Sequence, residues 1–127
     1  SQYWPGSGAD SNHPVKAWVA DDPNQVFVVA TDATWTSKAT ARAGVFANAN
    51  FATATSGSTT TGMSSGTLSI TTINTTNSLN MRILGWVDDA SNQDFSAAGI
   101  GVLVRVNNHF NSPNGSAAGG TAATVGI

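Results

Sequence analysis

The scarcity of charged side chains constrains the fold of this chain more than any motif does. Asp, Glu, Lys and Arg together make up 9% of the residues, and Glu is absent. A typical soluble domain carries charges on about a quarter of its residues, much of it as Lys and Glu on helix surfaces. Ala, Thr, Ser, Asn and Gly take that place here, and short polar side chains suit strands and turns better than solvated helices. The composition therefore predicts a protein built mainly from β-strands.

Length, charge and composition exclude several classes of binding partner and site. The 127 residues correspond to one domain, with a formal net charge of -2 and five scattered cations. No basic patch is present to hold a phosphate backbone, so we expect no nucleic-acid partner. The absence of cysteine excludes a disulfide framework and a thiolate metal site. No apolar run approaches the ~20 residues that span a bilayer, so we expect no membrane partner.

The chain divides into three parts. Residues 1–14 contain several Pro and Gly residues and are expected to form an irregular N-terminal arm. Residues 15–111 carry the strand patterns and form the β domain. Residues 112–127 are rich in Gly and Ala and form either a flexible tail or a short strand that docks on a partner.

Alternating apolar residues predict strands along the β domain. The expected strands are residues 16–20, 25–31, 67–73, 79–87 and 100–107. Residues 25–31 (QVFVVAT) are apolar on both faces, which predicts burial of both. Between residues 34 and 54 the periodicity fits a short helix and strand fragments about equally, and we favour strand.

These patterns together predict an all-β, single-domain fold. Successive strands separated by polar loops, without a clear amphipathic helix, indicate a sandwich or barrel of about six to eight strands. We expect it to be jelly-roll-like, with the N-terminal arm outside it.

Two acidic pairs, Asp21-Asp22 and Asp88-Asp89, are the first candidates for acid–base or metal chemistry. Adjacent residues on an extended chain point to opposite faces, so neither pair presents two carboxylates to one substrate. Turn formation is the favoured role, because Pro, Asn and Ser follow them. A calcium site that also uses Asn92 and Asp94 is the alternative, but the spacing differs from an EF-hand and no bidentate Glu exists. We therefore predict no metal site.

The histidines give little sign of catalysis. His13 and His109 alone fall short of a three-ligand zinc site, and no Gly-x-Ser-x-Gly elbow is present. A hydrolase that uses His109 with Asp88 or Asp89 ranks below every other hypothesis. We predict that the protein is not an enzyme and has no catalytic residues, no cofactor and no small-molecule substrate.

The aromatic residues and two arginines are the candidate interface residues. Indole rings anchor protein interfaces, and they also stack on sugars. A carbohydrate-binding or host-adhesion module that uses Trp4, Trp35 and the loop at residues 88–94 is therefore the alternative function. Two arginines at polar positions in strong strands are expected to bridge to Asp across the sheet or across a subunit boundary. The candidate interface consists of Tyr3, Trp4, Trp35, Arg82 and Arg105.

Several short segments together resemble a known class of viral protein. They are Tyr3-Trp4-Pro5, the turn Val19-Ala20-Asp21-Asp22-Pro23-Asn24, Val26-Phe27, Thr59-Thr60-Thr61-Gly62 with Ser64, Met81-Arg82-Ile83-Leu84-Gly85 and Val102-Leu103-Val104-Arg105-Val106-Asn107-Asn108-His109. Over residues 3–109 the chain resembles small structural proteins of tailed bacteriophages, which are encoded with the major capsid protein and sit on the head as decoration or cement subunits.

The resemblance implies a non-enzymatic virion structural protein. Such a β-rich subunit binds between major capsid protein subunits on the capsid surface, commonly as a homotrimer, and stabilises the phage head. The composition is compatible with this role, because a surface with few Lys and no Glu loses little side-chain entropy on forming a large interface. A capsid decoration protein is therefore the leading hypothesis.

Overall fold

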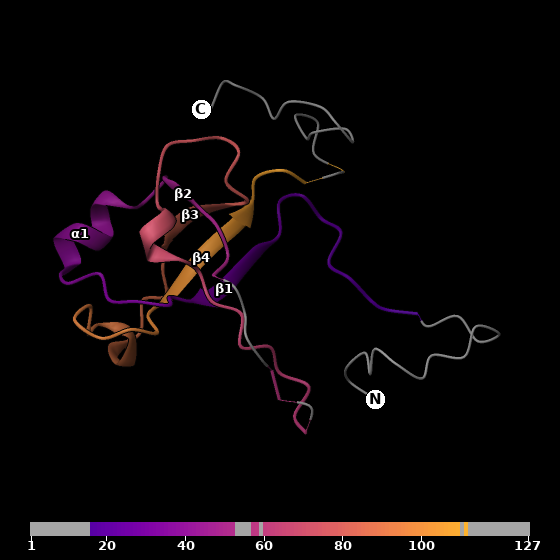
Figure 1. The fold of residues 1–127 in the computed structure, drawn as a ribbon, viewed down its shortest axis with the longest axis horizontal. Helices are drawn as coiled ribbons and strands as arrows, with labels where there is room; N and C mark the ends of the chain where they lie inside the picture. Colours follow the sequence, from indigo (N-terminus) through magenta and orange to yellow (C-terminus); the bar gives the residue numbers. More distant parts are fainter. Residues whose placement is uncertain (1–15, 53–56, 59, 110, 112–127) are drawn as a thin grey trace.

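The chain folds around one antiparallel β-sheet. The computed structural model describes residues 16–52, 57–58, 60–109 and 111 (Figure 1). The strands are β1 (Val26–Ala30), β2 (Asn48–Ala49), β3 (Met81–Trp86) and β4 (Gly101–Val106), in the order β1-β4-β3-β2. The helices are α1 (Lys38–Ala43) and two 3-10 turns, η1 (Ile70–Thr72) and η2 (Ala90–Asn92). The β-rich class is confirmed, and the described residues form a single four-stranded sheet.

The central strand β4 organises the sheet. It pairs with β1 along five residues and with β3 along its other side. These three strands confirm the predicted strands at residues 25–31, 79–87 and 100–107. β2 contributes only Asn48 and Ala49, which pair with Arg82 and Met81.

A bulge interrupts the alternation of β3. Ile83 lies opposite Val104, whereas Gly85 lies opposite Leu103, so Leu84 is the extra residue. Met81 and Ile83 point to the buried side, and after the bulge Trp86 packs against the same core. Simple alternation would have placed Trp86 on the opposite side.

Residues 38–43 form the helix α1. The prediction of strand between residues 34 and 54 was therefore wrong for these six residues. The hydroxyl of Ser37 accepts a hydrogen bond from the N–H of Thr40 and caps the helix N-terminus. Ala41 is the buried residue of the helix. Six residues make fewer than two turns, which is too short for a periodic pattern to distinguish helix from strand.

Two further predicted strands are wrong. Residues 67–73 form only an isolated bridge at Leu68 before the chain turns into η1. The carboxylate of Asp32 accepts the N–H of Ile70 at 2.9 Å, and the hydroxyl of Thr72 donates to the carbonyl of Ser69, which favours a turn over an extended chain. Residues 16–20 have no regular structure and are exposed.

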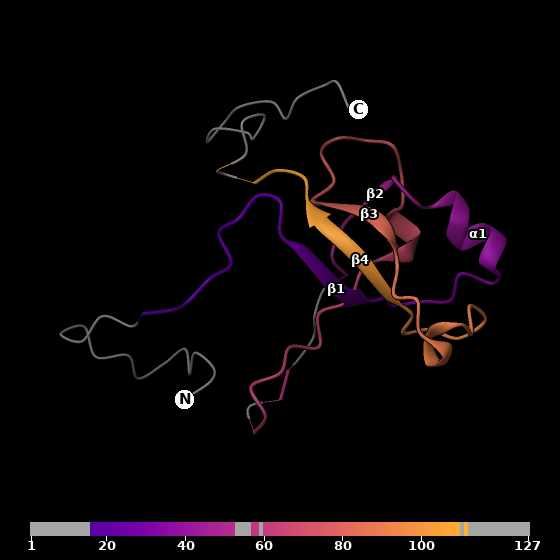
Figure 2. The same cartoon turned by 180° about the vertical axis from the view of Figure 1, so that it is seen from behind.

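One side of the sheet carries the core. Leu68, Ile83, Val102 and Val104 are the largest fully buried side chains. Around them, the segment before α1, α1 itself and the loop before β4 supply further buried residues, namely Trp35, Ala41, Phe95 and Ile100. The helix α1 lies on the side of the molecule away from the segment that precedes β1, as two opposite views show (Figures 1 and 2).

Leu68 joins the two ends of the sheet. Its N–H donates to the carbonyl of Ala30, at the end of β1, and its carbonyl accepts from the N–H of Asp32. It also forms an antiparallel bridge with Phe51, just after β2. Among the described residues, the edge of β1 is therefore covered at its C-terminal end only.

The packing of Trp35 predicts which glycines tolerate a side chain. A Cβ atom on Gly44 would lie 2.7 Å from Cζ3 and Cη2 of Trp35, whereas nothing lies within 4 Å of one on Gly85. We expect Gly44→Ala to lower the free energy of unfolding by about 1–3 kcal/mol, as overpacking does. Gly85→Ala is the matched control, expected to be neutral or slightly stabilising in a strand. Urea unfolding of both variants measures this, and equal effects would contradict the packing of Trp35.

Candidate functional site

The side of the sheet opposite the core is the candidate functional site. Val26 and Val28 of β1 point there and are 41% and 64% exposed. Their cross-strand partners on β4 are Arg105 and Leu103, and Arg105 pairs in turn with Arg82 on β3. We call these five residues the outer face. Burial of both faces of residues 25–31 was therefore wrong, because β1 is an edge strand of the described sheet and its valines are exposed on this side.

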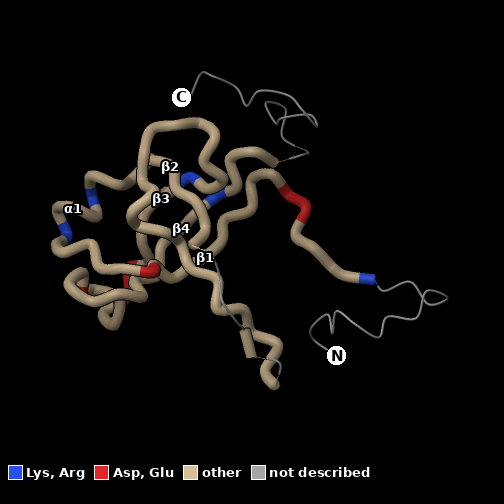
Figure 3. Tube along the Cα trace, in the orientation of Figure 1, with Lys and Arg blue, Asp and Glu red and all other residues tan. Residues whose placement is uncertain are grey.

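Two arginines lie side by side on the outer face. Arg82 and Arg105 are direct cross-strand partners and are half-buried. Like charges in this arrangement destabilise a sheet pair, because their Cβ atoms lie only about 5 Å apart. The Arg residues of β3 and β4 form neighbouring blue segments of the trace, and most acidic segments lie elsewhere (Figure 3). The pair gives the outer face a local positive charge.

Phe46 borders the outer face and was missed from the sequence. Its ring is 64% exposed and lies 6.0 Å from the guanidinium carbon of Arg82, a cation–π contact. Phe46 also has a φ of 68°, which is unusual for a bulky residue. Its N–H donates to the carbonyl of Ile83, which anchors this turn to β3. No sequence pattern signals a left-handed phenylalanine.

The free edge of β1 carries backbone groups that no other described strand covers. Alternate residues of a strand direct their N–H and C=O groups to opposite sides. The N–H of Thr31 donates to Ile100, and the carbonyl of Ala30 accepts from Leu68, which sets the phase along β1. The backbone groups of Val26 and Val28 therefore point away from β4. The side chain of Gln25 donates to the carbonyl of Val26 at 2.8 Å.

The acidic pairs serve the turns, as predicted. Asp22 accepts the N–H of Asn24 at 2.8 Å, and Asp89 caps η2 by accepting the N–H of Ser91. The Ser91 hydroxyl and then its N–H lower the pKa of Asp89, and Ser96 lowers the pKa of Asp94 in the same way. No group of three or more His, Asp or Glu residues that could hold a metal ion occurs in the part of the chain that the structure describes.

The residues of the hydrolase hypothesis lie apart. Asp88 follows the C-terminal end of β3, where the N–H of Val87 donates to Gly101 at the start of β4. His109 follows the other end of β4, and a six-residue strand is about 17 Å long. The Nδ1 atom of His109 accepts the N–H of Asn111. The structure therefore does not bring this imidazole to the carboxylates.

The structure places the candidate interface residues at different locations. Arg82 and Arg105 lie on the outer face, whereas Trp35 is 3% exposed and belongs to the core. Its place in the candidate interface is therefore wrong, because its indole is packed against Gly44. Tyr3 and Trp4 lie outside the described residues.

Asn92 has a structural role that the sequence analysis did not predict. Its Nδ2 donates to the carbonyls of Val87 and Gly101 at 2.8 and 2.9 Å, and its Oδ1 accepts the N–H of Gly101 at 2.7 Å. One amide thus joins the ends of β3 and β4. An Asn in an Asn-rich loop carries no distinguishing signal in the sequence.

Comparison with known proteins identifies no relative of this chain. No protein family, curated protein or solved structure matches the chain. None of the helices in the described part combines the length and apolarity that a membrane span requires.

We expect Asn92→Ala to destabilise the protein by about 2–4 kcal/mol, because three partly buried hydrogen bonds are lost and two backbone carbonyls lose a donor. Asn80→Ala is the control, since Asn80 is exposed and its hydrogen bonds to other described residues use its backbone groups. Urea unfolding of both variants measures the difference. A change below about 0.5 kcal/mol for Asn92→Ala would contradict the role of this amide.

Proposed function

We propose that this protein is a non-enzymatic virion structural protein that binds the capsid through its outer face. The observation that carries the proposal is the combination of a paired arginine site with exposed valines on an uncovered sheet surface. Exposed apolar side chains next to arginines are typical of protein interfaces, where Arg and aromatic residues are enriched. Phe46 extends this surface beside Arg82.

The chemistry of the arginine pair indicates the kind of partner. Two arginines on neighbouring strands supply guanidinium groups, which bind carboxylates in bidentate geometry. A partner carboxylate would also relieve the repulsion between Arg82 and Arg105. We therefore propose an acidic surface on the major capsid protein as the partner.

The resemblance supports the remaining features of the proposal. A decoration subunit on the capsid surface would stabilise the head between neighbouring capsid proteins, with a homotrimer as the proposed form. We also propose a jelly-roll-like sandwich or barrel for the complete chain. The bridges of Leu68 support it, because they connect the end of β1 to the chain after β2.

The glycan-binding alternative has lost one of its residues. It requires an exposed Trp35, and that indole is buried. The carboxylates of Asp89 and Asp94 in the same loop accept hydrogen bonds from Ser91 and Ser96. Protein binding is therefore the better-supported function.

The test is binding to undecorated phage heads built from the major capsid protein encoded with this chain. We expect saturating protein to bind and to raise the temperature at which the heads disrupt. The double variant Arg82→Ala/Arg105→Ala should bind at least about tenfold more weakly, since each charged hydrogen-bonded contact contributes roughly 1.5–3 kcal/mol.

The matched control is Lys38→Ala/Arg42→Ala, which removes the same charge from α1. It should bind like the parent protein. No binding by the parent protein, or equal loss in both double variants, would contradict the proposal. Glycan binding that is lost with Trp4→Ala would favour the adhesion alternative.

A further inference from the structure

We infer that the segment before β1 in one copy of this chain adds as a strand to the open edge of β1 in a second copy. We call residues 16–20 the proximal arm. The inference concerns association between copies and does not depend on binding to a capsid. It rests on three observations: the exposure of the proximal arm, the geometry of its turn, and the uncovered edge of β1.

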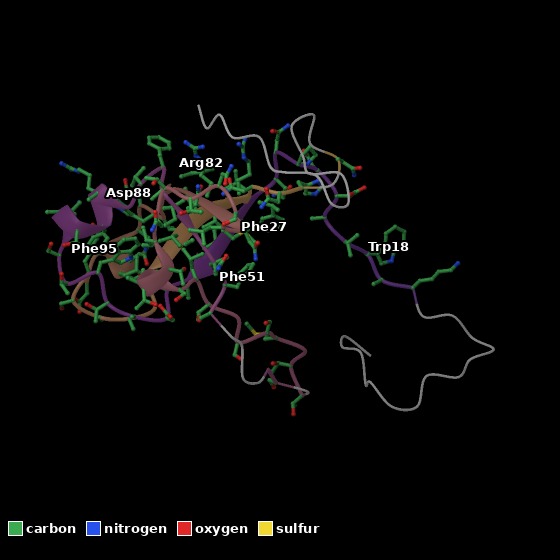
Figure 4. The ribbon with its side chains drawn as sticks, turned by 45° about the horizontal axis from the view of Figure 1, so that its top comes forward. Trp18, Phe27, Phe51, Arg82, Asp88 and Phe95 are labelled. Atoms are coloured by element: carbon green, nitrogen blue, oxygen red, sulfur yellow. The ribbon has the colours of Figure 1, made fainter. Side chains whose placement is uncertain are left out.

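The proximal arm carries apolar side chains with nothing packed on them. Trp18 is 102% exposed and Val19 is 78% exposed. Figure 4 shows Trp18 on a segment that leaves the sheet rather than folding against it. Full exposure of an indole forgoes a large hydrophobic gain, because a Trp side chain buries 150–250 Å² when packed. A partner surface is expected to cover it.

The turn between the proximal arm and β1 directs the arm away from its own strand. The N–H of Gln25 donates to the carbonyl of Asp22 at 3.0 Å, and the N–H of Asn24 donates to the Asp22 carboxylate. The side chain of Asn111 donates to the Asp21 carboxylate at 2.7 Å and holds the base of the arm. Opposite views agree that the arm diverges from β1 (Figures 1 and 2). The proximal arm leaves this turn without pairing with its own β1 in the described structure.

The edge of β1 fits an antiparallel strand of four residues. The backbone groups of Val26 and Val28 point outward, and coverage begins at Ala30, whose carbonyl accepts from Leu68. Residues 17–20 of a second copy fill this length with Trp18 opposite Val28. The carbonyl of Val26, which accepts from Gln25 in the free chain, would then accept a backbone N–H.

This register also matches the side chains. Trp18 would cover Val28, the more exposed of the two outward valines of β1, as an aromatic and β-branched cross-strand pair. Val19 would lie on the opposite face, beside Phe27, which packs against the core. The pairing would thus cover the outward-pointing groups of an edge that otherwise invites uncontrolled association.

Disulfide trapping tests the register, because the chain contains no cysteine. In this register Ala17 lies opposite Val29, whose backbone groups point to β4. The two residues therefore form a non-hydrogen-bonded pair, with Cα atoms about 4.5 Å apart. Ala17→Cys and Val29→Cys are purified separately, mixed and mildly oxidised. We expect a covalent heterodimer to form. Its rate of formation should be at least about tenfold higher than with a cysteine placed outside the proposed strand pair, because strand pairing raises the local thiol concentration.

The control replaces Ala17→Cys by Ala43→Cys, an exposed position in α1. Heterodimer formation with Val29→Cys should then fall to the rate of random collision. Equal rates in the two mixtures would overturn the inference. So would exclusive formation of an intramolecular disulfide in the Ala17→Cys/Val29→Cys double variant, since the arm would then cover its own edge.

A second measurement avoids any change in the sheet. Trp18→Ser in the full chain should lower the mass measured by sedimentation toward that of one copy, whereas the exposed substitution Lys16→Ser should leave it unchanged. A parent protein that stays a single copy at high concentration would overturn the inference. A negative result in this experiment would overturn association between copies but not capsid binding, which the assay with phage heads tests independently.

Discussion

The pairing of β4 on both of its sides is the interaction on which the rest of the structure depends. It places Val102 and Val104 beside Ile83 in the core, and these three side chains are almost completely buried. The turn η1, α1 and the bridge at Leu68 contribute to this one side. The described part of the chain has few large apolar residues and covers one side of its sheet in this way, while Val26 and Val28 on the other side stay exposed.

The uncovered side explains the proposed function in physical terms. A sheet surface with Val26, Val28 and two adjacent arginines gains by contact with another protein, because contact removes apolar area from water and neutralises like charges. Few long charged side chains surround it, which lowers the entropy lost on binding. The open edge of β1 adds backbone hydrogen bonds that a second strand can complete.

The sequence predicted the strands that alternate and missed the features that depend on tertiary contact. Residues 79–87 and 100–107 alternate clearly, and their strands are confirmed. The bulge at Leu84 and the left-handed Phe46 leave no pattern in a single sequence. Trp35 was placed on the surface because it lies in an irregular segment, yet its indole fits where Gly44 leaves space. Arg82 and Arg105 were identified as candidates, but only the register shows that they are neighbours.

Amide hydrogen exchange along β1 tests most directly whether this sheet leaves one edge for another protein. In dilute protein the N–H groups of Phe27 and Val29, which point to β4, should exchange slowly, and those of Val26 and Val28 should exchange quickly. Raising the protein concentration, or adding the partner, should slow the exchange of Val26 and Val28 selectively. Equal protection of all four amides in the isolated single chain would contradict an open edge.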